Sequence, residues 1–125
     1  MDKVIIKEAQ FMCNIGVSKE ERAKKQNIVV DVELFLNLEK ASSTDDIKHT
    51  INYSEIHSLM KDIAEEKEYK LIEALAENIA KEILNKFSVK KVRVRIKKPE
   101  ALANRNVKYV AVEILRKKNN NLARW

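Results

Sequence analysis

The chain has 125 residues, which suits a single domain, with 35% charged and 45% hydrophobic residues and a formal net charge of +6. Acidic residues are interleaved with basic ones along nearly the whole chain, which favours solvated charged faces over a dedicated nucleic-acid surface. A single cysteine, Cys13, excludes an intramolecular disulfide. Residues 1–7 are too short and too charged for a secretion signal, and no apolar stretch approaches the roughly 20 residues that span a bilayer, so we expect a cytoplasmic protein without membrane contact.

The first half of the chain predicts two strands. Residues 3–15 mix β-branched and polar residues and are expected to form the first strand, with the small side chain of Cys13 buried. Residues 16–26 form a charged loop that begins with the only glycine, Gly16. Residues 27–38 alternate between apolar and polar side chains, which is the strongest strand signal in the chain. Residues 39–51 are a polar connection.

The second half predicts two helices followed by two strands. Asn52 and Glu55 have the spacing of a capping box that opens a helix. A charged turn at residues 65–70 separates this helix from a second one, whose apolar side extends from Ile72 to Leu84. Residues 89–98 and 107–116 are expected to be strands, joined by a loop at 99–106, and residues 117–125 form a polar tail.

The element order β-β-α-α-β-β predicts one α+β domain over residues 1–116. Two helices can cover one face of a four-stranded antiparallel sheet. The other face would then carry charged side chains: Asp31, Glu33, Arg93, Arg95 and Lys97. Such a sheet has open edges, which proteins pair or block. Closing several copies into a ring would pair them, and the alternative is a monomer with a solvated face.

Four polar residues occupy positions that suit chemistry, although each has an ordinary structural explanation. Glu21 follows the glycine turn, where a surface glutamate is also expected, and Tyr53 lies at a helix start, where tyrosine usually packs. Glu73 lies in the first turn of the second helix, where a carboxylate interacts favourably with the helix dipole. Lys98 ends a strand, where exposure to solvent is the default.

Several classes of site are not indicated. His49 and His57 are the only histidines, Cys13 is far from both in sequence, and no metal-ligand spacing is present. A single glycine excludes the Walker loop and the dinucleotide fingerprint. Asp45 and Asp46 are adjacent acids, for which a role in a turn is favoured. We therefore expect neither a metal nor a cofactor.

Segments from Lys3 to about Arg116 together resemble the dihydroneopterin aldolase family. In chain order these are Ile15-Gly16-Val17 with Glu21 and Gln26, Val29-Val30-Asp31-Val32, Thr44-Asp45-Asp46, Ile51-Asn52-Tyr53, Leu71 to Glu77, Val94 to Pro99, and Val112-Glu113-Ile114. The resemblance implies the tunnelling fold, in which four subunits close into a barrel and two rings often stack. It therefore implies a homotetramer or homo-octamer with active sites between neighbouring subunits.

The family reaction is the metal-independent retro-aldol cleavage of dihydroneopterin to hydroxymethyl-dihydropterin and glycolaldehyde. An imine in the dihydropterin ring accepts the released electrons, so neither a metal nor a lysine Schiff base is needed. By resemblance, Glu73 would bind the guanidine-like edge of the pterin through two charge-assisted hydrogen bonds, with Asn52 and Ile72 also at the substrate. Lys98 would move protons and stabilise the ionising hydroxyl, Tyr53 would protonate the enol intermediate, and Glu21 would lie near the reacting side chain.

The chain departs from the common family pattern at two points. Many members have His-Gly where this chain has Ile15-Gly16, and residues 100–105 replace a run of small residues and prolines after Pro99. The second departure leaves the substrate preference open. An epimerase of the same superfamily is an alternative, and some relatives act on the triphosphate, whose phosphates Arg105 or Lys108 could meet.

A basic RNA-binding α+β module is a third interpretation of the sequence. Arg93, Arg95 and Lys97 would supply its basic strand. This strand lacks the stacking aromatic residues of RNA-recognition sheets, and the chain has no GXXG loop, so the sequence favours an enzyme without a nucleic-acid partner.

Overall fold

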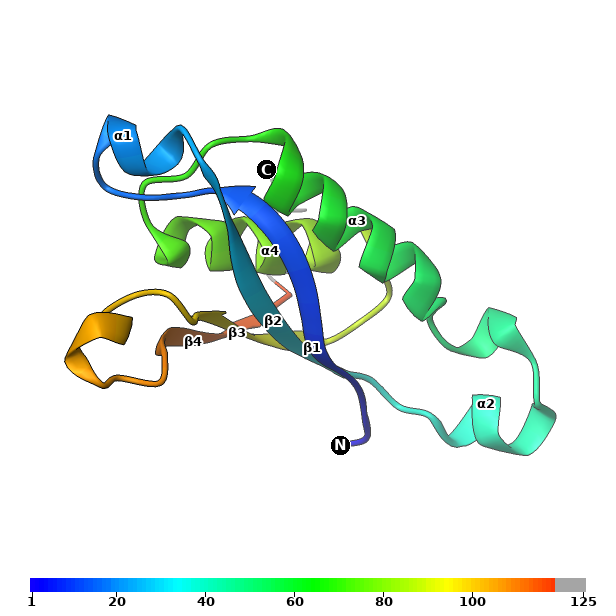
Figure 1. Cartoon of the computed structure of the whole chain (residues 1–125). Helices are drawn as coiled ribbons and strands as arrows, with labels where there is room; N and C mark the ends of the chain where they lie inside the picture. The colour runs from blue at the N-terminus through cyan, green and yellow to red at the C-terminus, as the bar shows by residue number, and fades with distance from the viewer. Residues whose placement is uncertain (119–125) are drawn as a thin grey trace.

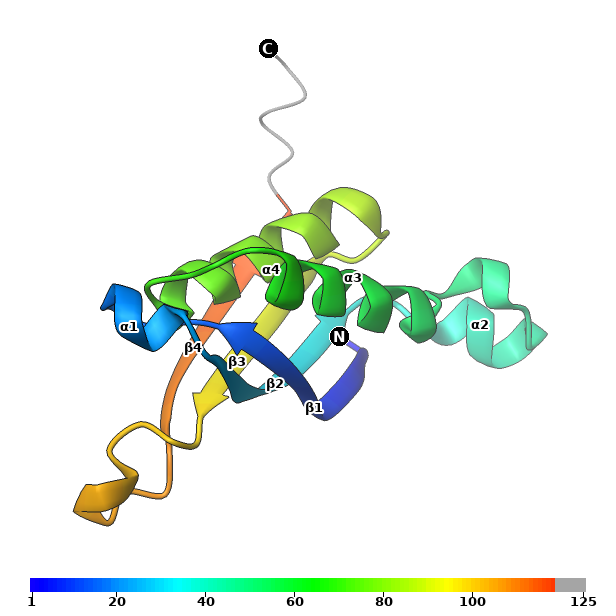
Figure 2. The same cartoon turned by 45° about the horizontal axis from the view of Figure 1, so that its top comes forward.

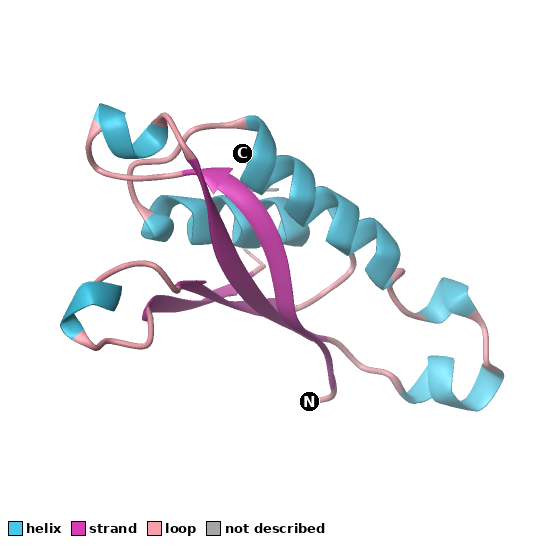
Figure 3. Cartoon of the chain, in the orientation of Figure 1, coloured by secondary structure: helices cyan, strands magenta, loops and turns pink. Residues whose placement is uncertain are grey.

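A four-stranded antiparallel sheet is the centre of the computed structural model, which describes residues 1–118 (Figure 3). Its strands are β1 (Lys3–Asn14), β2 (Lys25–Phe35), β3 (Lys91–Lys98) and β4 (Val110–Lys117), and they lie side by side in chain order. The four predicted strands are confirmed. The last one begins at Val110 rather than at residue 107, because the connection before it turns through Asn106 in a left-handed backbone conformation (φ 62°). The predicted polar tail lies almost wholly outside the described residues.

Two helices cover one face of the sheet, as the sequence predicted (Figures 1 and 2). They are α3 (Tyr53–Glu66) and α4 (Ile72–Lys86). Asn52 caps α3, because its side-chain oxygen accepts a hydrogen bond of 3.0 Å from the backbone N–H of Ser54. Helix α4 begins after Leu71, which provides no side-chain cap. The predicted helix starts are therefore confirmed, and the two helices differ in how their first turns are satisfied.

Four short helical segments lie where the sequence predicted only loops. They are α1 (Lys19–Arg22), α2 (Glu39–Thr44), η1 (Ile47–His49) and η2 (Ala103–Arg105). None of them contains a buried residue, so no hydrophobic periodicity marks them in the sequence. Figure 2 shows that α2 and η1 project at one end of the molecule, whereas the connection containing η2 projects at the other.

The core lies between the sheet and the two helices. The alternation of β2 and β3 places buried aliphatic side chains on this side of the sheet: Ile28, Val30, Val32, Leu34, Val92, Val94 and Ile96. Cys13 is a free thiol with no exposed surface, and this burial raises its pKa to about 11. The predicted burial of Cys13 is therefore confirmed.

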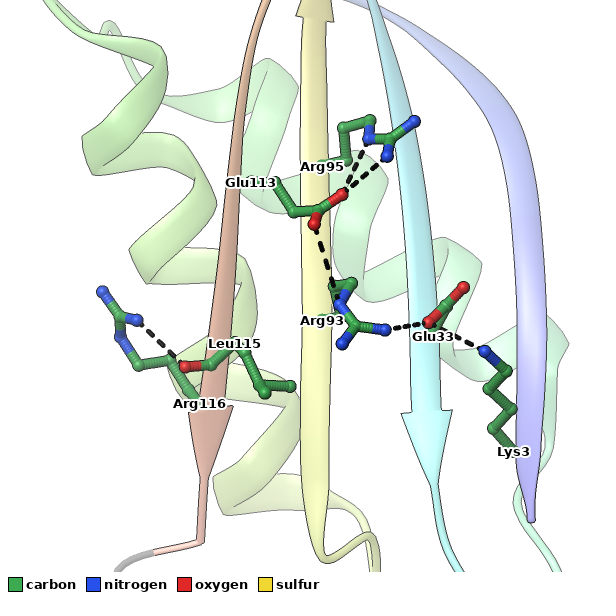
Figure 4. Close-up of polar contacts among 7 residues, drawn as sticks. All are labelled: Lys3, Glu33, Arg93, Arg95, Glu113, Leu115 and Arg116. Atoms are coloured by element: carbon green, nitrogen blue, oxygen red, sulfur yellow. Dashed lines mark hydrogen bonds and ion pairs between the residues drawn. The ribbon is translucent and has the colours of Figure 1, made fainter. Parts of the chain in front are cut away.

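The opposite face of the sheet is charged, as predicted from the alternation. Ion pairs connect all four strands in one row, which comprises Lys3, Glu33, Arg93, Glu113 and Arg95 (Figure 4). A further ion pair of 3.5 Å joins Lys97 to Asp31. The sheet is thus apolar toward the helices and is covered by paired charges on its other side.

Candidate active site

The turn after β1 depends on its glycine for space. A Cβ atom on Gly16 would lie 2.4 Å from Cβ of Glu21 and 2.6 Å from its carboxyl carbon, far closer than real side chains approach one another. The backbone of Gly16 is not in the left-handed region, so conformational freedom is not the reason for a glycine here. The glycine is needed because the side chain of Glu21 lies directly against its backbone.

Helix α1 holds Glu21 over this turn. Ser18 caps the helix, and its hydroxyl oxygen accepts a hydrogen bond of 3.1 Å from the backbone N–H of Glu21. Gln26 supports the turn from β2, because its side-chain amide donates to the carbonyl oxygen of Ile15 at 2.7 Å. The Glu21 carboxylate is therefore presented from a short segment that is tied to both neighbouring strands.

Lys98 meets Glu21 from the end of β3. Its ammonium group donates a hydrogen bond of 3.0 Å to Oε2 of Glu21, although the two residues are 77 positions apart in sequence. The Lys98 side chain is only 17% exposed, whereas that of Glu21 is 42% exposed. The hydrogen bond from Lys98 holds the pKa of Glu21 below its usual value. The structure thus brings two predicted site residues together as an ion pair with one accessible side.

A short parallel bridge fixes the start of α4 beside the same turn. The backbone N–H of Gly16 donates to the carbonyl oxygen of Tyr69 at 2.9 Å, and Tyr69 N–H donates to the carbonyl oxygen of Asn14 at 3.0 Å. Tyr69 lies three residues before Ile72, the first residue of α4, so this helix begins close to the turn that follows β1 (Figure 1). The bridge therefore places Glu73 on the Glu21 side of the molecule.

Glu73 and Ile72 offer a ligand different groups. The Glu73 side chain is exposed and has no hydrogen bond or ion pair within residues 1–118. The Ile72 side chain is buried in the core, so its backbone N–H in the uncapped first turn is what it can present. A free carboxylate beside free N–H groups complements a ligand edge that carries both hydrogen-bond donors and an acceptor.

Asn52 and Tyr53 lie at the other end of the molecule. Helix α3 has 14 residues and is therefore about 20 Å long. Its last turn leads into the segment with Tyr69, so its start, at Tyr53, lies away from that segment. Figures 1 and 2 show the start of α3 at the opposite end of the molecule from α1, which contains Glu21. The Tyr53 side chain is 64% exposed, so packing within the chain does not explain it. One copy of the chain does not bring these two residues to the Glu21–Lys98 pair.

The family model for dihydroneopterin aldolase matches residues 4–115 of the chain. The chain belongs to the dihydroneopterin aldolase family. It is 42% identical over 120 residues to the dihydroneopterin aldolase of Bacillus subtilis, covering 95% of this chain and all of that protein.

Two solved structures of the dihydroneopterin aldolase family share the fold. A dihydroneopterin aldolase described as putative, from Vibrio cholerae, superposes with a TM-score of 0.90 at 32% identity, over 94% of this chain and 98% of that one. The Escherichia coli dihydroneopterin aldolase in complex with neopterin superposes with a TM-score of 0.88 at 31% identity, over 93% of this chain and 99% of that one. The α+β fold class inferred from the resemblance, a four-stranded antiparallel sheet with two helices on one face, is thereby confirmed, and this chain is an enzyme of the dihydroneopterin aldolase family.

Residues 1–118 contain no group of three or more His, Cys, Asp or Glu side chains arranged to hold a metal ion. None of the helices in this range has the length and apolar content that a bilayer crossing requires.

One residue beside the ion pair was missed by the sequence analysis. Arg22 is only 15% exposed and donates to the carbonyl oxygens of Gly16 and Val17. Its basic neighbours in sequence, such as Lys24 and Lys25, made it look like one more charged loop residue. Only the folded turn distinguishes it from them.

Proposed function

We propose that this chain cleaves dihydroneopterin to hydroxymethyl-dihydropterin and glycolaldehyde, with residues 1–116 as the single catalytic domain. The observation that carries the proposal is the contact of Lys98 with Glu21 at 3.0 Å, in a member of the dihydroneopterin aldolase family. An ammonium group that is held by a carboxylate and is open on one side can stabilise a hydroxyl group as it ionises.

Glu73 is proposed to bind the pterin. A pterin ring presents adjacent N–H donors on its guanidine-like edge and a carbonyl acceptor beside them. The exposed Glu73 carboxylate can accept two charge-assisted hydrogen bonds from that edge, while backbone N–H groups at the start of α4, including that of Ile72, can donate to the carbonyl. The E. coli relative, which is 31% identical, was solved with neopterin bound, and this supports a pterin as the ligand.

The bond changes assign a role to Lys98. The hydroxyl on the second side-chain carbon loses its proton, and the bond between the first and second carbons breaks, which releases glycolaldehyde. The released electron pair forms a double bond between the first side-chain carbon and the ring, and the imine nitrogen gains a proton, which leaves an enol. The Lys98 ammonium group stabilises the ionising hydroxyl, donates a proton to the ring nitrogen and takes up the proton that the hydroxyl loses, and Glu21 keeps this group at the reacting side chain.

Tyr53 completes the reaction in this proposal by protonating the first side-chain carbon of the enol, while the ring nitrogen loses its proton, the imine re-forms and the tyrosine is re-protonated. Because Tyr53 and Asn52 lie at the far end of α3, they would serve the site of a neighbouring copy. The tetramer or octamer of the resemblance would bring the two halves together. The sheet supports such an arrangement, since β1 and β4 are its edge strands and each has one side without a strand partner among the described residues.

A turnover assay tests the proposed function. Purified protein is incubated with dihydroneopterin and the products are separated by chromatography, for the wild type, Lys98→Ala and a control, Lys81→Ala, which alters an exposed lysine on α4. We expect hydroxymethyl-dihydropterin from the wild type and the control, and a loss of about 10²–10⁴-fold in Lys98→Ala.

Three other outcomes would contradict the proposal. Formation of dihydromonapterin alone would identify the enzyme as an epimerase. Turnover of dihydroneopterin triphosphate alone would show that the triphosphate is the substrate. Unchanged turnover in Lys98→Ala would remove Lys98 from the mechanism.

A further inference from the structure

We propose that Arg22 is a positioning residue that fixes the turn at residues 15–17 and thereby keeps Glu21 against Lys98. Its kinetic consequence rests on the proposed function, whereas its geometric consequence does not. Arg22 forms no hydrogen bond with Lys98, and its Nε and Nη1 groups are occupied by Glu68, Gly16 and Val17. It acts through the backbone of the segment against which Glu21 lies.

The guanidinium group of Arg22 holds three acceptors at once. Nη1 donates to the carbonyl oxygen of Gly16 at 3.0 Å and to that of Val17 at 2.9 Å. Nε donates to Oε1 of Glu68 at 3.3 Å. The donors of a planar guanidinium group have fixed directions. These contacts therefore fix the orientation of the turn as well as its distance from Arg22.

These contacts connect the turn to a part of the chain that is anchored in the core. Glu68 precedes Tyr69, whose carbonyl oxygen accepts from Gly16 N–H and whose side chain is only 8% exposed. The backbone of Arg22 is itself tied to β1, because Asn14 donates a side-chain hydrogen bond of 2.9 Å to its carbonyl oxygen. Arg22 thus joins α1, the glycine turn and the segment before α4 into one unit.

Helix α1 needs such support, because it has only four residues. A single helical turn is not stable by itself in water. Glu21 lies within this turn, and its carboxylate must stay at 3.0 Å from Lys98 for the ion pair to persist. A displacement of about 1 Å is enough to cost up to 10²-fold in rate when it moves a catalytic group.

The experiment compares Arg22→Ala and Arg22→Lys with Lys24→Ala, which removes a neighbouring exposed positive charge that forms no side-chain hydrogen bond or ion pair within residues 1–118. For Arg22→Ala we expect kcat to fall by about 10–100-fold and KM for dihydroneopterin to change by less than about threefold, because Glu73 is left in place. Lys24→Ala is expected to stay within about twofold of the wild type in both parameters. A general loss of stability would not produce this division between kcat and KM in the folded protein.

A crystal structure of Arg22→Ala gives a readout that does not require activity. We expect the Glu21–Lys98 contact to open beyond hydrogen-bond distance while the sheet is unchanged, whereas Lys24→Ala keeps the contact. Either an intact contact or a kcat within twofold of Lys24→Ala would overturn the proposal.

Arg22→Lys keeps the charge but not the fork, so it decides the question if Arg22→Ala fails to fold. We expect its kcat to fall by about fivefold or more, and a kcat equal to that of Lys24→Ala would overturn the proposal. A wild type that does not turn over dihydroneopterin would instead overturn the proposed function. The crystallographic comparison would then still test the positioning.

Discussion

The contact between Glu21 and Lys98 depends on the absence of a side chain at residue 16. A Cβ atom at residue 16 would lie 2.6 Å from the carboxyl carbon of Glu21 and 2.4 Å from its Cβ atom. A methyl group at this position would therefore push Glu21 away from the turn, and Glu21 would carry its carboxylate away from the ammonium group of Lys98. The glycine acts on the chemistry through steric space alone.

Gly16→Ala is therefore expected to impair turnover more than stability. The closest atom, Cβ of Glu21, moves only with the backbone of α1, so this helix has to shift. Because α1 has only four residues and buries none of them, the fold can accommodate the shift, but the Glu21–Lys98 hydrogen bond cannot persist unchanged. We expect a fall of about 10-fold or more in kcat with a change of only a few degrees in Tm. Steady-state kinetics and thermal unfolding measure the two effects. A kcat equal to that of the wild type would show that Glu21 does not need this position.

Among the elements, the segment between α3 and α4 connects the core with the site. Tyr69 donates its hydroxyl hydrogen to the carbonyl oxygen of Ile63 at 3.1 Å and accepts a hydrogen bond of 2.9 Å from Asn78. Its backbone pairs with the strand end beside Gly16. Burial raises the pKa of its hydroxyl, so this group stays a neutral donor over the working range. One residue therefore joins both helices to the glycine turn, the helices through its side chain and the turn through its backbone.

Tyr69→Phe is expected to destabilise the protein by about 1–2 kcal/mol, because the carbonyl of Ile63 and the amide of Asn78 lose their shared partner. Urea unfolding of the variant and the wild type measures the difference in the free energy of unfolding. Tyr109→Phe is the matched control, because this tyrosine is 39% exposed and its hydroxyl has no hydrogen bond within residues 1–118. An equal effect of the two substitutions would refute the role given to Tyr69.

The sequence predicts the strands and the two long helices because burial imposes a period on them. Val30, Val32 and Leu34 alternate with charged residues, and the same pattern holds in β3. The short helices escape prediction because they bury nothing. The pairing of Ile15 with Tyr69 escapes it because a bridge of one residue leaves no pattern.

The site is predictable only in part, for a related reason. No spacing rule connects residues 21 and 98, and their association comes from the family resemblance until the fold brings them together. The sequence does not indicate the role of Arg22, because its partners are mainly backbone carbonyl groups, which every residue has. Residue identity indicates chemistry, but contacts with the backbone appear only after folding.

On the scale of the whole molecule, the charged face of the sheet stabilises the fold in a pH-dependent way. Glu33 lies in the row of ion pairs that crosses the strands (Figure 4). Loss of hydration raises the pKa of Glu33, but the hydrogen bonds from Lys3 and Arg93 outweigh it and hold the pKa below its usual value. A lowered carboxyl pKa contributes stability above the unfolded pKa of about 4.3, and this contribution is lost as the pH falls through the folded value.

Glu33→Gln is therefore expected to be less stable than the wild type near pH 7, by up to about 1 kcal/mol, and the difference is expected to shrink near pH 3. Urea unfolding at the two pH values measures it. Glu66→Gln, at an exposed glutamate on the last turn of α3, is expected to show little difference at either pH. If the loss of unfolding free energy in Glu33→Gln instead grew as the pH fell, the Glu33 ion pairs would not be the source of the pH dependence.

The separation of Tyr53 from Lys98 leads to a test of the proposed assembly. If each site takes Lys98 from one copy and Tyr53 from its neighbour, Lys98→Ala and Tyr53→Phe damage different halves. Each variant alone is expected to be nearly inactive, and co-expression is expected to restore roughly a quarter of the wild-type activity, because about that fraction of randomly assembled sites has both intact halves. Mixed oligomers without recovered activity would show that the two residues do not share a site.

Chemical labelling of Cys13 can measure how often the core of this fold opens. Its thiol has no exposed surface and a pKa of about 11, so a water-borne alkylating reagent reaches it as a thiolate only when β1 separates from the helices. The rate at which Cys13 is alkylated in the native protein therefore measures how often the core between the sheet and the helices opens. A pterin or a neighbouring subunit that binds the closed form should lower the alkylation rate, and more so the more it stabilises that form.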